Sequence, residues 1–182
     1  MLETLRSIIQ EVNEAKDLNA SLEIIVRRVQ KAMETRVCSV YLLDNNLERY
    51  VLMATKGLDA SSVGKASLSL EEGLVGLVAQ RAEPVNLENA SSHPRYVYIP
   101  ETREEEFESF LGVPVIHHRE VLGVLVVQQA DVRAFDAEEE AFLITLSAKL
   151  AGIIANEEAR GAITGFSPTG LKTTDASFDG GA

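Results

Sequence analysis

The stretch SFLGVPVIHHREVLGVLVVQQA, residues 109–130, decides the fold. It contains two apolar runs separated by His118 and Arg119, and two such runs joined by a short turn are typical of a β-hairpin. The second run is almost continuously apolar from Val121 to Val127, a pattern found in strands that are covered on both faces. The sequence therefore predicts an antiparallel sheet with the 120–130 strand near its centre.

Further strands are expected on the N-terminal side of this hairpin. The runs VCSVYLLD (37–44) and RYVLMAT (49–55) are separated by a turn that contains Asp44, Asn45 and Asn46, and they form a second predicted hairpin. Residues 64–70 and 84–87 are shorter strand candidates. The sheet is thus expected to have about six strands.

Helical periodicity appears at both ends of the chain and once in the middle. Residues 2–16 and about 19–35 carry apolar side chains at helical spacing, and so does 137–159, which follows the capping residue Asp136. A short apolar helix is expected at 74–81. Hairpins flanked by helices predict an α+β fold, in which the helices pack on an antiparallel sheet.

Composition narrows the possible functions. The chain has 182 residues, enough for one domain, and a formal net charge of −11, which disfavours nucleic-acid binding. No run approaches the roughly 20 apolar residues of a membrane span, and the first residues are acidic rather than typical of a secretion signal. The single cysteine, Cys38, cannot form an internal disulfide, which predicts a cytoplasmic protein.

No catalytic or metal-binding pattern is evident. Cys38 lies in an apolar strand and is expected to be buried and structural. Metal ligation by His93 together with His117 or His118 is an alternative, but three histidines without cysteine ligands favour a solvated turn. The glycines at 73 and 76 lack the Lys-Ser/Thr of a phosphate loop. We expect no metal, no cofactor and no catalytic residue.

The long connection between residues 86 and 110 is the candidate ligand site, because long ordered connections often carry function. It offers an amide, a planar cation and aromatic groups, a mixture that suits a small polar ligand. Alternatively, the two tyrosines cover the sheet and the arginine pairs with one of the acidic residues at 101–106. The predicted ligand-binding residues are Asn86, Arg95, Tyr96, Tyr98 and Phe110.

Three segments give the chain a resemblance to a known family. EEGLVGLVAQRAEPVNLENASSHPRY (71–96), FLGVPVIHHREVLGVLVVQQ (110–129) and the opening IIQEVNEAKDLNASLEIIVRRV (8–29) resemble GAF domains. The resemblance is strongest to the N-terminal GAF domains of phosphoenolpyruvate–protein phosphotransferases of the nitrogen system. It implies that residues 1–159 form a sensory domain with the N- and C-terminal helices on one face of the sheet and a pocket on the other.

The same resemblance suggests what the domain senses and controls. It implies regulation of phosphotransfer by domains expected to lie outside this chain, with glutamine or 2-oxoglutarate as the first ligands to test. Residues 160–182 are rich in Gly, Ser and Thr and are expected to form a flexible linker or tail.

Two apolar helix faces predict a homodimer, because an N-terminal helix outside a compact sheet needs a partner for its apolar face. The alternative is that both faces pack on the sheet. Two other functions stay open: an oligomerisation module whose pocket is filled by its own aromatic residues, and a methionine sulfoxide reductase, which the lone cysteine disfavours. The predicted interface residues are Leu5, Ile8, Ile9, Val12, Leu146, Leu150 and Ile153.

Overall fold

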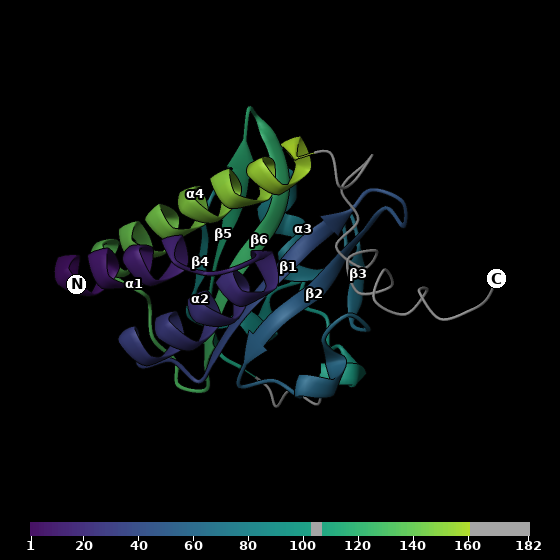
Figure 1. Cartoon of the computed structure of the whole chain (residues 1–182). Coiled ribbons are helices and arrows are strands. Elements are labelled where there is room, and N and C mark those ends of the chain that lie inside the picture. The colour runs from purple at the N-terminus through teal and green to yellow at the C-terminus, as the bar shows by residue number, and fades with distance from the viewer. Residues whose placement is uncertain (103–106, 161–182) are drawn as a thin grey trace.

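The computed structural model describes residues 1–102 and 107–160 of the chain (Figure 1). The predicted tail, 160–182, lies outside this part except for Arg160. The helices are α1 (Leu2–Asn13), α2 (Leu18–Ala32), α3 (Gly73–Arg81) and α4 (Ala137–Ala159), with 3-10 turns at Ala60–Ser62, Ala90–Ser92 and Pro100–Thr102. The strands are β1 (Val37–Asp44), β2 (Arg49–Lys56), β3 (Ser67–Ser69), β4 (Val85–Leu87), β5 (Ser109–His117) and β6 (Glu120–Gln129).

The six strands form one antiparallel sheet in the order β3-β2-β1-β6-β5-β4. Both predicted hairpins are confirmed, and the β5–β6 turn falls at His118 and Arg119, which both adopt positive φ as a tight two-residue hairpin turn requires. β6 lies between β1 and β5, and its side chains from Val124 to Val127 are at most 1% exposed. The central, doubly covered strand is therefore confirmed, and with it the predicted α+β fold built on an antiparallel sheet.

The sheet separates two apolar clusters. On one face α2 and α4 pack against the strands, and α1 packs against these two helices (Figure 1). On the other face lie α3 and the connection that follows β4. Because side chains alternate along a strand, Leu125 and Val127 of β6 enter the helical cluster, whereas Val124 and Val126 enter the second cluster.

Aspartates fix the starts of α2 and α4. The Asp17 side chain accepts a hydrogen bond from the Ala20 amide at 2.8 Å. At α4, Asp136 and Glu139 form a reciprocal capping box. The predicted cap at Asp136 is thus confirmed, and it places the start of a 23-residue helix beside the end of the sheet.

The predicted interface residues have partners within the chain itself. Ile8, Val12, Leu146 and Leu150 are at most 3% exposed, and Leu5, Ile9 and Ile153 pack against the same helical cluster. The reasoning that α1 lacks a partner was wrong, because α1 lies across α2 and α4 and Glu11 of α1 forms ion pairs with Arg27 and Arg28 of α2. A homodimer stays a prediction, but four of its seven proposed contacts are in the core of one subunit.

One strand is shorter than expected. The sequence predicts a strand at 64–70, but β3 covers only three residues because Gly64 has a positive φ and Glu72 already caps α3. In the described residues, we find no helix with the length and apolar character needed to cross a membrane.

Two glycines provide a matched test of this architecture. A Cβ on Gly123 of β6 would overlap the Tyr41 carbonyl oxygen and lie 2.8 Å from the Leu42 side chain, whereas a Cβ on Gly152 of α4 meets nothing within 4 Å. We expect Gly123→Ala to lower the free energy of unfolding by about 1–3 kcal/mol, because it overpacks the β1–β6 contact. Gly152→Ala is expected to raise it by about 0.5–1 kcal/mol. Urea unfolding of both variants measures this, and equal effects would contradict the close approach at Gly123.

Candidate functional site

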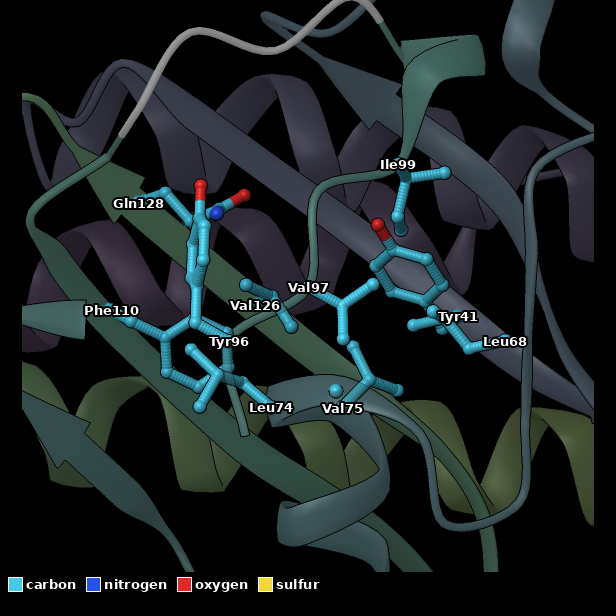
Figure 2. A pocket seen from close by; sticks show the side chains of 11 residues that line it. Tyr41, Leu68, Leu74, Val75, Tyr96, Val97, Ile99, Phe110, Val126 and Gln128 are labelled. Atoms are coloured by element: carbon cyan, nitrogen blue, oxygen red, sulfur yellow. The ribbon is translucent and has the colours of Figure 1, made fainter. Parts of the chain in front are cut away.

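A small pocket lies on the face of the sheet opposite α2 and α4 (Figure 2). The sheet provides its floor, the start of α3 one side, and the connection after β4 the other. Its walls carry no charged side chain among the described residues that line it. The lining residues are Tyr41, Leu68, Gly73, Leu74, Val75, Tyr96, Val97, Ile99, Phe110, Val126 and Gln128.

Strand alternation selects the residues of the floor. Phe110 of β5 lies directly opposite Gln128 of β6, so both side chains are on the same face, and Val126 follows two residues along the strand. Gly112 leaves room for the Phe110 ring, because a Cβ there would come within 2.8 Å of that ring and of Val78. The aromatic ring thus lies over a glycine and forms part of the wall.

The first turn of α3 faces the pocket through Gly73, Leu74 and Val75. Its N-cap, Glu72, makes no side-chain capping hydrogen bond. The first amides of a helix have no partner within the helix, and the helix dipole favours negative charge at this end. The pocket therefore has one side suited to an anionic group such as a carboxylate.

Gln128 provides the opposite polar group. Its side chain points into the pocket (Figure 2), only 8% of the residue is exposed, and no hydrogen bond of its carboxamide is found within residues 1–102 and 107–160. The carboxamide has two donors and an acceptor, which are available to a ligand or to water. Sequence reasoning missed this residue, although a polar residue at the end of an apolar strand, on the same face as Val124 and Val126, was the available signal.

The pocket is closed in this structure. Its free volume is about 30 Å³, whereas pockets for small ligands measure about 300–1,000 Å³. Tyr96, Val97 and Ile99 cover it, and the Arg95 guanidinium donates a hydrogen bond to the Glu71 carbonyl oxygen just before α3. A ligand larger than one or two waters requires this cover to move.

The predicted ligand residues separate into two groups. Tyr96 and Phe110 line the pocket, and Arg95 lies at its edge with its guanidinium on the main chain of Glu71. Asn86 and Tyr98 do not line it. Asn86 lies on β4 between two residues of the pocket-side cluster, so its own side chain faces the helices, and Tyr98 is 51% exposed. The structure does not bring all five residues together, because neighbouring residues of the segment point to different faces, and their role in ligand binding stays a prediction.

The other candidate residues take structural positions. Cys38 is fully buried in the helical cluster, and this burial raises the pKa of its thiol above the ordinary value. His117 and His118 stack with ring centroids 4.0 Å apart, and the His93 Nδ1 accepts a hydrogen bond from the Arg95 amide. Among the described residues, no three His, Cys, Asp or Glu side chains are grouped as a metal site.

The chain belongs to the GAF domain family. The family model for the GAF domain matches residues 17–154, which include the whole sheet, α2, α3 and the pocket. The fold and the position of the pocket agree with this assignment.

Relatives of this chain include proteins of the phosphoenolpyruvate-dependent phosphotransferase system. The chain is 44% identical over 176 residues to the phosphoenolpyruvate-dependent phosphotransferase system protein of Salmonella typhimurium, covering 97% of this chain and 24% of that protein. The chain thus spans about a quarter of this curated relative. Among solved structures it is similar to the GAF domain of an Acinetobacter phosphoenolpyruvate-protein phosphotransferase, with 54% identity and a TM-score of 0.84, covering 90% and 97% of the two chains. The GAF domain of the Coxiella burnetii phosphotransferase (ptsP) gives 47% identity, a TM-score of 0.86 and the same coverage.

The raised pKa of Cys38 leads to a pH prediction. Because the folded thiol stays protonated while the unfolded thiol ionises near its ordinary pKa of about 8.5, its contribution to stability is complete below that pH and is lost above it. We expect the free energy of unfolding to fall by up to about 1.4 kcal/mol per pH unit from this group between pH 9 and 10. Urea unfolding at several pH values measures the slope.

The Cys38→Ala variant is the control, since it lacks the thiol and should show a shallower slope. Ellman's reagent should react with the wild-type thiol only after unfolding. Rapid reaction of the folded protein at pH 8 would contradict the buried, unreactive assignment.

Proposed function

We propose that this GAF domain is a regulatory sensor of a small amino-acid-like ligand in a phosphoenolpyruvate–protein phosphotransferase, where it controls phosphotransfer by other domains. The single observation that supports sensing is the Gln128 side chain, which is 8% exposed as a residue and points its carboxamide into the pocket opposite the uncapped start of α3. The similarity to phosphotransferase GAF domains supports the parent protein. A cytoplasmic location, predicted from the single cysteine, is part of this proposal.

The chemistry of the pocket favours glutamine over 2-oxoglutarate. A ligand carboxylate would accept hydrogen bonds from the first amides of α3, and a ligand carboxamide would pair with that of Gln128 through one donor and one acceptor. Glutamine has both groups, and its charged α-ammonium lies beside its own α-carboxylate, so the molecule carries no net charge at neutral pH. 2-Oxoglutarate has two carboxylates, and the described lining offers no charged side chain to offset the second one.

Binding requires the closed pocket to open. The cover formed by Tyr96, Val97 and Ile99 must move away from Gly73 and Val75, and the hydrogen bond from Arg95 to the Glu71 carbonyl joins the two sides. The population of the open form multiplies the intrinsic affinity, so a mostly closed domain binds more weakly than its contacts alone would give. This opening is the change that the domain would report to the rest of the protein.

A second candidate function, an oligomerisation module without a ligand, is favoured by the 30 Å³ volume and by the tyrosine and phenylalanine that fill the site. Both candidates use α4. Its outward face includes the uncharged residues Ala141, Ile144, Thr145 and Ala148, all exposed in one subunit, with the exposed Glu138 one turn before them. We propose these uncharged residues, close to the exposed Leu2 of α1, as the homodimer contact in place of the buried residues.

Gln128 provides the test of ligand sensing. We expect glutamine to bind the 182-residue chain, and Gln128→Leu to weaken binding by about tenfold or more, since it leaves the ligand carboxamide without a partner. 2-Oxoglutarate is expected to bind more weakly than glutamine. Isothermal titration calorimetry measures the three affinities.

Gln129→Leu is the matched control, because Gln129 is adjacent, lies on the opposite face and accepts a hydrogen bond from the Arg36 amide. It should leave the affinity for glutamine within about twofold. Failure of both ligands to bind at millimolar concentration, or equal affinities of Gln128→Leu and wild type, would remove the sensing proposal and leave the oligomerisation module.

The dimer contact is tested separately. We expect the wild-type chain to sediment at twice its mass of 19.8 kDa and Ile144→Asp to sediment as a monomer, because a buried carboxylate without a partner opposes association. Val132→Asp, at a loop position that is 59% exposed, is the control and should stay dimeric. A monomeric wild type, or a dimeric Ile144→Asp variant, would contradict this interface.

A further inference from the structure

Strand β5, which lines the pocket through Phe110, and its neighbour β4 also hold the segment leading into α4. Asn86 of β4 donates from its carboxamide nitrogen to the Phe135 carbonyl at 2.8 Å, and its carboxamide oxygen accepts from the Phe135 amide at 3.3 Å. A side-chain amide is thus paired at two points with one residue of the main chain. Phe135 itself is buried in the helical cluster and immediately precedes Asp136, the N-cap of α4.

Ser109 of β5 makes a second attachment to the same segment. Its hydroxyl donates to the Asp131 carbonyl and accepts from the Arg133 amide at 2.9 Å. The Ser109 residue is fully buried. The segment 131–135 is therefore fixed by one side chain from each of the two strands.

The start of α4 is fixed in turn by this segment. The Arg133 guanidinium lies 4.5 Å from the centre of the Phe135 ring and forms an ion pair with Glu139 at 3.0 Å. Glu139 is also the third residue of α4 and a member of its capping box with Asp136. A shift of segment 131–135 relative to the sheet would disturb the first turn of α4 at several points.

The pocket wall and these attachments share the same backbone. Phe110 of β5 lines the pocket and is adjacent to Ser109, and Leu87 of β4 packs in the pocket-side cluster and is adjacent to Asn86. Adjacent residues of a strand point to opposite faces. A displacement of Phe110 or Leu87 on the pocket face therefore moves the backbone that carries Ser109 and Asn86 on the helical face.

We propose that Asn86 and Ser109 are positioning residues that couple the state of the pocket to the start of α4. The proposal rests on the proposed function for its ligand, but the coupling is a property of the fold. Contiguous packing and hydrogen bonds carry such coupling when two sites both contact one structural element and both shift with it. Here that element is the paired β4–β5 edge of the sheet, with the pocket on one side and segment 131–135 on the other.

A double-mutant cycle without ligand tests the coupling. Phe110→Leu perturbs the pocket wall, and we expect it to accelerate amide hydrogen exchange at residues 139–146 of α4 by about tenfold in the wild-type background. In the Asn86→Ala, Ser109→Ala background the further effect of Phe110→Leu should fall below about twofold. Hydrogen–deuterium exchange of the full 182-residue chain measures both, with the β6 amides as an internal reference for global unfolding.

Ser39→Ala is the matched control for Ser109→Ala. Ser39 is also a fully buried strand serine with a side-chain hydrogen bond, to Thr55 at 2.9 Å, but it lies on β1, away from segment 131–135. In that background the effect of Phe110→Leu on α4 should be unchanged. If the double variant is too unstable, the single variants Asn86→Ser and Ser109→Ala replace it, and each should reduce the effect by about threefold.

Three results would overturn the coupling. The first is that Phe110→Leu accelerates amide exchange in α4 equally with and without Asn86 and Ser109. The second is that Phe110→Leu does not change exchange in α4 in the wild-type background. The third is that glutamine binds but leaves exchange at residues 139–146 unchanged. The cycle succeeds or fails without any ligand, so a failure of glutamine to bind removes the sensing proposal and not the coupling. Binding without a change in α4 removes the coupling and not the sensing proposal.

Discussion

Strand β6 is buried on both faces, and the two cores of the domain meet through it. Leu125 and Val127 belong to the helical cluster, and Val124 and Val126 belong to the pocket-side cluster. A strand of this kind cannot slip by one residue without exchanging its two sets of side chains, so its register fixes which residues reach the pocket. Gln128 faces the pocket for this reason, and the neighbouring Gln129 faces the helices.

The same alternation explains why the described lining of the pocket carries no charged side chain. Among the described lining residues, the strands supply Tyr41, Leu68, Phe110, Val126 and Gln128, and the polar groups are those of Tyr41, Tyr96, Gln128 and the start of α3. Such a wall can discriminate a neutral polar ligand from a charged one, because burying unpaired charge costs much more than burying a satisfied amide. Selectivity would then follow from the lack of charged side chains in the described lining as well as from its polar groups.

Sequence periodicity was enough for the sheet but not for the site. The two apolar runs within 109–130 identified the hairpin, and the nearly continuous run from Val121 to Val127 identified the central strand, because the side chains of a strand reflect the surroundings of its two faces. The sequence pattern of a strand or helix does not show which distant element covers its apolar face. The partner of α1 and the attachment of Asn86 to Phe135, 49 residues away, depend on the path of the chain between elements. Gln128 was missed because a polar residue near a strand end resembles an exposed terminus.

The structure connects a closed pocket to a helix with a capped start, and the same attachments affect both the opening of the pocket and the response of the helix. A ligand shifts the domain only by its difference in affinity for the open and closed forms, so part of its binding energy is used in parting the cover from α3. The attachments at Asn86 and Ser109 make the β4–β5 edge and the start of α4 move as a unit, which raises the cost of deforming the wall near Phe110. They also ensure that any such deformation reaches α4. Weak binding and efficient transmission would therefore share one cause, the stiffness of this edge of the sheet.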